Sequence, residues 1–483
     1  MAEIDYLSQI GHSSEESYTE EEASIIRCLM AKNDALIDAI DAELADLLIK
    51  RNKHLDYARR GKVALAPFKK LPLEIVGDVF LHVSWSTIKI PFPFGESARG
   101  RRLMPTQVVL AQVCSAWRKI AFSIPRLWNV VSIEQMEDHT RTIASELLSR
   151  ARGSAITLTG YEPFSSKTLG TLIMSNQFKS LQIMLSSKRL PRFQRLLSEA
   201  CENLESLSLD IHCNTPQERE ISVTLNPDKY PCLEYLSLHS FDGIINLQTS
   251  VIPWHQLTTL NLYTVRSSQL DVLCQCMSLT KLKIHVEWVG INNVREVCLR
   301  RLLNFALRTS PNDASSLLRI FNFSNLEEFE VNNLIRPFTD IQELMLQRFN
   351  FRRLRVLDIS ELRMIDNIDI SAILSCTPCL ESLSLPGQSE RIAMDQNTMK
   401  QIAEGWLGPS IRRIRFLGNK CTWDRALKFA ETRLESAKAS QKFGWSRKIA
   451  PFESIFFNIV DRATPDHSRR REVLNRCGTV VNL

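Results

Sequence analysis

Two groups of cysteines have the spacing closest to that of a metal site. Cys376 and Cys379 stand in a Cys-Thr-Pro-Cys run, and Cys274 lies two residues before Cys276. A structural zinc ion takes four ligands, so a Cys-x-x-Cys pair supplies half a site and needs a second such pair or a closely spaced histidine pair. Neither occurs at ligand spacing. We therefore expect no metal ion and no cofactor.

Motifs that carry catalysis in many enzyme families are also missing. The chain has no GxxxxGK phosphate loop, no GxGxxG run after a strand, no HExxH and no GxSxG turn. Its 9 histidines and 54 acidic residues are scattered, and none stands beside a nucleophile in a recognisable arrangement. The sequence indicates no catalytic residue, so we expect a binding protein and not an enzyme.

Side chains suited to binding another protein are concentrated between Tyr235 and Arg308. Aromatic and basic residues recur there at positions that we expect to point outward from short strands. Tyr and Arg are frequent at the energetic centres of protein interfaces. For any single residue, a merely solvated position is the better interpretation. As a set they are the candidate binding residues: Tyr235, His239, Tyr263, Lys281, Lys283, His285 and Arg308.

A repeated pattern positions these residues. Leu-x-x-Leu-x-Leu, with Ile, Val or Phe allowed, occurs about ten times between Phe178 and Phe416, at a spacing of roughly 22 to 31 residues, and leucine-rich repeats are about 20 to 29 residues long. In a strand the second and third apolar positions point to one side, so Leu207 and Leu209 enter the core. The segments between motifs, such as Ser268 to Cys276 and Ser371 to Cys376, have helical character.

The pattern predicts an α/β fold. We expect a leucine-rich-repeat solenoid over residues 132–440, with parallel strands on its concave face and helices on its convex face. Cys201, Cys232 and Cys379 lie just before the repeat motif, where we interpret them as small core residues.

Ahead of the repeats, residues 67–131 carry two apolar stripes at helical spacing. Pro72 suits the first position of a helix whose stripe runs to Val83. A second helix begins near Thr106, a residue that can cap it, and has Val109, Val113, Trp117 and Ile120 on one face. Residues 84–105 separate the two stripes and are interpreted as an inserted loop.

Three short motifs on these helices resemble the F-box, in the order that this family has them. They are Leu71-Pro72-Leu73-Glu74-Ile75, Val113-Cys114-Ser115-Ala116-Trp117-Arg118 and Pro125-Arg126-Leu127-Trp128. The chain thus resembles fungal-type F-box domain-containing proteins with a C-terminal leucine-rich-repeat array. The resemblance implies that the helices bind the adaptor subunit of a cullin-RING ubiquitin ligase, through Leu71, Pro72, Glu74, Ile75, Val76, Val113, Cys114 and Trp117. Trp117 is equally suited to the core of the module itself.

The N-terminal region divides into a polar segment and a long helix. We expect residues 1–19 to be disordered. Residues 20–61 form an apolar stripe without proline, with acidic residues first, basic residues last and Gly61 as the C-cap. A coiled-coil homodimer is one interpretation, and a helix that docks on its own chain is the other. The spacing is nearer 3.6 than 3.5 residues.

Bulk composition limits the remaining classes. The 483 residues carry a net charge of +6 from 60 basic and 54 acidic groups, which is too mild an excess to indicate nucleic-acid binding. No apolar stretch is long enough for a membrane span, and the 12 scattered cysteines fit a reducing compartment. We expect a cytoplasmic or nuclear protein that binds neither nucleic acid nor membrane. Residues 441–483 are interpreted as a cap, with an added strand near Phe452–Val460, and a tail.

Together these features favour a substrate-recognition subunit of an SCF-type cullin-RING E3 ubiquitin ligase. The resemblance implies that the F-box binds the adaptor and that the repeats bind an unknown protein substrate, which is ubiquitinated through proximity. The alternative is a protein-interaction scaffold that uses the same two regions without ubiquitin transfer. A repeat-borne enzyme is disfavoured by the missing motifs.

Overall fold

A computed structural model describes the chain in two units, Met1–Val79 and Phe80–Leu483. It describes all residues except 1–17, 66–69, 85–86, 91–103, 134–137, 152–155, 161–171, 174–177, 214–219, 288–294, 310–313, 333–350, 362–368, 386–395, 445–446, 460 and 483. The expected disorder at residues 1–19 and most of the expected loop at 84–105 therefore lie outside the described residues.

The first unit consists mainly of one long helix, α2 (Glu20–Ala64). Thr19 and Glu22 form a capping box: the Glu22 amide donates to Thr19 Oγ1 at 3.4 Å, and the Thr19 amide donates to Glu22 Oε2 at 2.9 Å. The expected end at Gly61 was wrong, because the Gly61 carbonyl still accepts a helical hydrogen bond from the Leu65 amide at 3.0 Å. None of the residues of α2 is buried.

Three further helices cover the region of the two apolar stripes. They are α3 (Leu73–Val83), α4 (Thr106–Val113) and α5 (Ser115–Ser123). The expected single second helix was wrong, because Cys114 is extended, with φ −160° and ψ 171°. Its sulfur accepts a hydrogen bond from the Trp117 amide at 3.4 Å and so caps α5.

A short strand within residues 84–105 connects this region to the sheet. It is β1 (Ile88–Ile90), which pairs in parallel with β2 (Val130–Ile133). Ile88, Val131 and Ile133 are fully buried. This burial explains why residues 88–90 of the expected inserted loop form a strand.

Among the described residues, the second unit is built on a sheet of 17 strands. Every strand pairing that the described residues make is parallel. After β2 the neighbours follow chain order as β3 (Ile156–Gly160), β4 (Phe178–Ser186), β5 (Ser206–His212), β7 (Tyr235–Ser240), β9 (Thr259–Arg266), β10 (Lys281–Glu287), β12 (Asn304–Thr309), β14 (Glu328–Asn332), β15 (Val356–Asp358), β16 (Ser382–Leu385), β17 (Arg413–Cys421), β18 (Ser454–Ile459) and β19 (Val480–Asn482). Short strands β6 (Glu220–Ile221) and β8 (Ile244–Ile245) pair beside them.

The core lies under the second and third apolar positions of each repeat. Leu207 and Leu209 on β5 and Leu260 and Leu262 on β9 have no exposed surface. In register with them, Leu282 on β10 continues the same buried row. This confirms that the repeat motif marks inward-facing strand residues of a long parallel sheet in an α/β fold.

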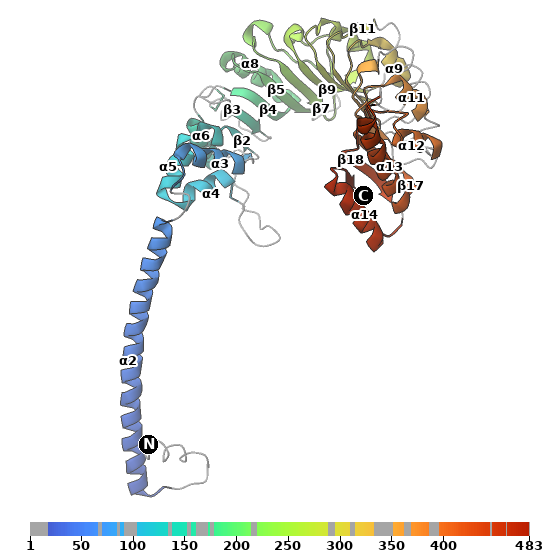
Figure 1. Cartoon of the computed structure of the whole chain (residues 1–483). Helices are drawn as coiled ribbons and strands as arrows, with labels where there is room; N and C mark the ends of the chain where they lie inside the picture. The colour runs from blue at the N-terminus through green and yellow to red at the C-terminus, as the bar shows by residue number, and fades with distance from the viewer. Residues whose placement is uncertain are drawn as a thin grey trace. The chain divides into compact units, whose positions relative to one another are not determined.

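Helical segments join successive strands. In Figure 1 they lie outside the curved row of strands: α8 (Leu190–Ala200), η7 (Ser267–Gln275), α9 (Ala314–Ile320), α11 (Ile370–Cys376) and α12 (Gln396–Ala403). The expected helical segment at Ser268 to Cys276 is a 3-10 helix. Of the three cysteines assigned to the core, Cys201 is buried, but Cys232 and Cys379 are exposed. The core assignment was wrong for those two.

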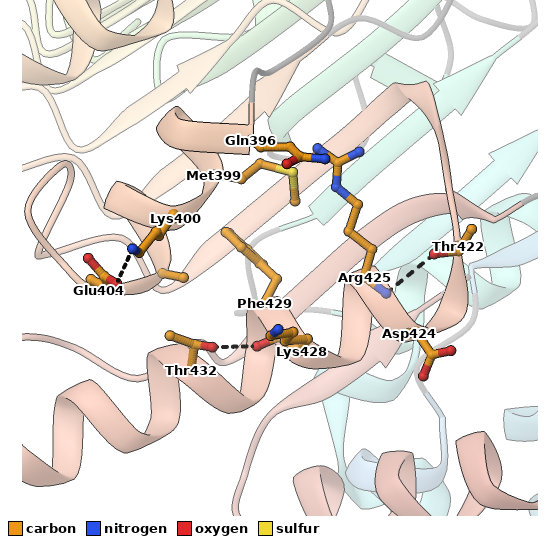
Figure 2. Close-up of a pocket in the computed structure, with 11 residues that line it drawn as sticks. Gln396, Met399, Lys400, Glu404, Thr422, Asp424, Arg425, Lys428, Phe429 and Thr432 are labelled. Atoms are coloured by element: carbon orange, nitrogen blue, oxygen red, sulfur yellow. Dashed lines mark hydrogen bonds and ion pairs between the residues drawn. The ribbon is translucent and has the colours of Figure 1, made fainter.

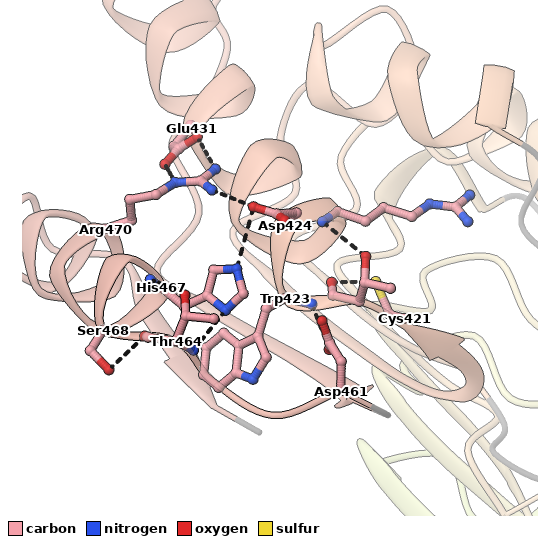
Figure 3. A network of polar contacts seen from close by, with 11 residues as sticks. Cys421, Trp423, Asp424, Glu431, Asp461, Thr464, His467, Ser468 and Arg470 are labelled. Atoms are coloured by element: carbon pink, nitrogen blue, oxygen red, sulfur yellow. Dashed lines mark hydrogen bonds and ion pairs between the residues drawn. The ribbon is translucent and has the colours of Figure 1, made fainter.

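The C-terminal residues close the sheet. After β17 follow α13 (Trp423–Lys442), the expected strand β18, α14 (Pro465–Arg476) and β19. Residues 465–483, interpreted as a tail, thus contain a helix and a strand. Figure 3 shows why α14 stays on α13: Arg470 donates twice to Glu431, at 2.8 Å each, and once to Asp424 at 2.7 Å. Arg470 and His467 lower the pKa of Asp424.

A buried arginine stabilises the same end of the sheet. Arg433 on α13 has no exposed surface and donates to five backbone carbonyls, those of Ile402, Gly408, Pro409, Ile411 and Ala450, at 2.7 to 3.1 Å. Burial lowers its pKa to about 10. Because one carbonyl lies in α12 and the other four lie in the segments that precede β17 and β18, one side chain fixes several connections.

Candidate interaction surface

One row of polar and aromatic side chains crosses five strands of the sheet. Asp210 on β5 is in register with His239 on β7, which is in register with Tyr263 on β9. The row continues to His285 on β10 and Arg308 on β12. Neighbouring strands are about 4.8 Å apart, so the structure brings four of the seven predicted binding residues together with one acidic residue.

An aromatic cluster occupies the first half of this row. The His239 ring lies 4.9 Å from the Tyr263 ring and 4.1 Å from Phe241, and His212 stacks on Phe241 at 4.4 Å. His239 Nδ1 is 3.3 Å from a carboxylate oxygen of Asp210. Phe241 is 47% exposed, so a large apolar ring is held at the surface by its neighbours.

Sequence reasoning missed His212 and Phe241. They stand two residues after Asp210 and His239, so the outward alternation of β5 and β7 continues to them. That alternation was the available signal. The repeat motif ends before these positions, and only the register of the two strands brings their rings into contact.

A strained residue lies directly beside the cluster. Thr264 has φ 67°, in the left-handed region that a β-branched residue rarely adopts. The pairing of β9 with β10 shifts there, because His285 pairs with Tyr263 while Val286 pairs with Val265. Thr264 Oγ1 donates to the Ser240 carbonyl at 3.1 Å. Such bulges redirect neighbouring side chains, and backbone strain of this kind is enriched at functional sites.

The second half of the row is basic. Lys281 is exposed and Lys283 is half-buried on β10, beside the exposed Arg308 on β12. Within the described residues these three cations have no ion pair. Three other cations near strands pair with an acid of the next repeat: Lys179 with Glu205 at 2.6 Å, Arg355 with Glu381 at 2.9 Å and Arg412 with Glu453 at 3.1 Å. Lys281, Lys283 and Arg308 lack such a cross-repeat ion pair within the described residues.

Neighbouring residues hold the ring of Tyr235 and lower the pKa of His285. Asn261 Nδ2 donates to the Tyr235 hydroxyl at 2.8 Å, and Asn261 is itself in register with Lys283. Burial lowers the pKa of His285, and the positive charge of Arg308 and the nearby His239 lower it further. These effects favour the neutral form of His285 beside the Arg308 cation. On the far side, β14 turns acidic with Glu328 and Glu330.

The predicted adaptor-binding residues differ widely in exposure. Val113 on α4 is 57% exposed, and Leu71 and Ile75 are also exposed large apolar residues. Pro72 and Glu74 lie on the surface too. Large apolar side chains exposed on or beside short helices are available for contact with a partner.

The other three predicted adaptor-binding residues serve packing. Val76 is 5% exposed and so packs inside the chain, and its role in adaptor binding stays a prediction. Trp117 is half-buried, with its ring 5.0 Å from Phe80, and Cys114 is engaged in capping α5. The contact with Phe80 places part of the Trp117 ring in the packing of the helical region, and its remaining surface stays accessible.

A cleft of about 650 Å³ lies between α12 and α13. Figure 2 shows its charged side chains: Lys400 and Glu404 form an ion pair of 3.7 Å, and Lys428, Asp424 and Arg425 project from α13. No nucleophile stands beside a base among the residues that line it. The acidic and basic side chains that line the cleft are not arranged for a recognisable reaction.

Metal and membrane chemistry find no support in the part of the chain that the structure describes. It contains no group of three or more His, Cys, Asp or Glu side chains that could hold a metal ion. Among the same residues, no helix is both long and apolar enough to cross a membrane. Cys376 and Cys379 are free and exposed.

Comparisons with known proteins give little. The chain matches no known protein-family model and no curated protein. Among solved structures it is similar to a crystal structure of a TLR13–ssRNA13 complex, at 16% sequence identity and a TM-score of 0.35. That match covers 60% of this chain and 44% of the other, so the chain spans less than half of its length.

Proposed function

We propose that this chain is an F-box substrate-recognition subunit of an SCF-type cullin-RING E3 ubiquitin ligase, with a leucine-rich-repeat solenoid that binds the substrate protein. The observation that carries the proposal is the exposure of Leu71, Ile75 and Val113, the apolar residues of two F-box-like motifs. Phe80 and Trp128, in the same stretch of the chain, are buried, so the exposed set lies outside the core that these two rings help to form. An adaptor is the partner that this motif order predicts.

The repeats supply the second half of the proposed function. Their strands run parallel, with buried leucines on one side and the row from Asp210 to Arg308 on the other. Parallel strands joined by outer helical segments support the solenoid, and such arrays use their strand face for binding. Binding a substrate there would bring its lysines near a conjugating enzyme held by the ligase, which raises their effective concentration.

The adaptor half is tested by co-purification. Replacing Leu71 and Pro72 together with Ala removes exposed side chains at the start of α3, so we expect loss of the adaptor of a cullin-RING ligase with unchanged thermal unfolding of the second unit. Met277→Ala removes an equally prominent apolar side chain from the repeats and should leave adaptor binding unchanged. Full adaptor binding by the double variant would refute the assignment.

The alternative remains a scaffold without ubiquitin transfer. The same double variant separates the two functions. It leaves the repeats unchanged, so a partner should still be captured whether the chain is a receptor or a scaffold. If the chain is a receptor, ubiquitin chains on a captured partner should disappear in the variant while the partner is still captured. If the chain is a scaffold, no ubiquitin chains depend on Leu71 and Pro72.

A further inference from the structure

Helix α2 carries an apolar seam that none of the described residues buries. Large apolar residues along it are exposed, and no residue of the helix is buried. Its 45 residues span about 68 Å at 1.5 Å per residue. A helix of this length that stays apolar on one face is stabilised mainly when another surface covers that face.

The seam repeats every eleven residues. Counting from Ile25 in steps of four, four and three gives a set that is apolar at seven of its nine positions: Ile25, Leu29, Asn33, Leu36, Ile40, Leu44, Leu47, Arg51 and Leu55. At 100° per residue these positions fall in a sector of about 120°. An eleven-residue period corresponds to about 3.67 residues per turn and suits a nearly straight or slightly right-handed helix pair, unlike a heptad repeat.

The charges of α2 are distributed about the same centre as the seam. Ile40 lies fifteen residues from both Ile25 and Leu55, and twenty residues from both Glu20 and Arg60. From Glu20 to Ile40 there are five acidic and two basic residues, and from Asp41 to Ala64 there are four acidic and six basic residues. The helix is therefore negative before its midpoint and positive after it.

This symmetry indicates which partner covers the seam of α2 and in which direction that partner runs. We propose that α2 pairs with α2 of a second copy of this chain, antiparallel, about a two-fold axis near Ile40. In that arrangement the acidic first turn (Glu20, Glu21 and Glu22) of each copy faces the basic end (Arg59, Arg60 and Lys62) of the other, and the helix dipoles oppose one another.

A parallel pair would be electrostatically worse. It would place acidic first turns side by side and stack the two copies of Arg51 in the seam. The antiparallel pair instead opposes Arg51 to Leu29 and separates the two arginines by about 33 Å. It also places the residues that follow Ala64 in the two copies at opposite ends of the helix pair.

The test measures the mass of the full chain in solution by light scattering and sedimentation. The wild type should have twice the monomer mass of 55.3 kDa. Ile40→Asp should give the monomer, because it puts two carboxylates at the axis. Ile49→Asp, an exposed position outside the seam, should remain dimeric. A monomeric wild type, or a dimer that survives Ile40→Asp, would overturn the proposal.

Charge reversal tests the direction. Replacing Glu20, Glu21 and Glu22 with Lys should weaken dimerisation by about tenfold or more at low salt. Reversing Arg59, Arg60 and Lys62 to Glu in the same chain should restore it. If the first reversal acted only by opposing the helix dipole, the variant with all six reversals would dimerise more weakly still. Unchanged dimerisation in the first variant would overturn the antiparallel arrangement.

Discussion

The strands β5 to β10 and the helix α2 both carry apolar residues at a regular period, yet they differ in what covers those residues. Leu207, Leu238 and Leu260 have no exposed surface, whereas Ile40 on α2 is 58% exposed and Leu47 is 55% exposed. Each strand is covered by its neighbours and by the segment that follows it. The helix has no such partner among the described residues. Periodicity therefore specifies an apolar surface, but it does not specify the molecule that buries it.

A core substitution should show the largest difference between the two regions. Leu282→Ala removes a buried side chain that is in register with Leu260 and Phe305, so we expect the free energy of unfolding to fall by about 2 to 5 kcal/mol. Leu44→Ala on α2 removes the same atoms from an exposed site. It should change the unfolding of the second unit by less than about 0.5 kcal/mol.

Denaturant unfolding followed by tryptophan fluorescence measures both variants, because Trp128 and Trp254 are buried in the second unit. The comparison would fail if Leu44→Ala destabilised that unit as much as Leu282→Ala does. Such a result would mean that α2 docks on its own chain, which was the other interpretation of its stripe.

A smaller effect is expected at the outward face of the same strands. Reversing Lys281 and Lys283 to Glu should weaken partner capture by about tenfold or more, with little change in thermal stability. The reason is that these cations have no ion pair within the described residues, so they are available to an acidic partner. Ubiquitin-modified partners recovered from cells with a blocked proteasome provide the measurement.

Arg192→Glu with Arg195→Glu makes the matched change of charge on α8, where both residues are exposed. It should leave capture unchanged. If this variant abolished capture and the β10 variant did not, the partner would bind the helical side of the sheet and not its strand face.

Sequence patterns predicted the sheet far better than its details. The inward leucines follow from alternation alone, because each repeat contributes one strand to a common core. The break at Cys114 was missed because the helical stripe continues through it, while a single sulfur cap and an extended backbone end one helix and start another. The burial of Val76 could not be predicted, because a motif position does not state which side of a helix is covered.

The candidate surface was predictable in the same limited way. Outward alternation identified His239, Tyr263, His285 and Arg308 as one set. Their grouping with Phe241 depends on strand register and on the bulge at Thr264, and both arise from packing between residues that are distant in sequence. At the C-terminus, Arg433 reads as an ordinary helical cation, although it is fully buried among carbonyl groups.

The smallest predicted effect is a pH dependence of stability that belongs to the strand face alone. The pKa of His285 is lowered from 6.5 in the folded chain, first by burial and then by Arg308 and His239. The unfolded chain therefore binds this proton more readily than the folded chain does. The stability that neutral His285 contributes is complete above the unfolded pKa of about 6.5, and it is lost as the pH falls through the lower folded pKa.

His285→Gln should reduce the loss of thermal stability between pH 7.5 and a pH of about 5.5, measured by calorimetry. His255→Gln on the exposed part of η6 (Trp254–Gln256) should not. Arg308→Gln should reduce it only in part, because burial is the larger cause. An unchanged pH profile in His285→Gln would show that this histidine is equally easy to protonate in the folded and unfolded chain, and that the row from Asp210 to Arg308 is more open to water than its packing indicates.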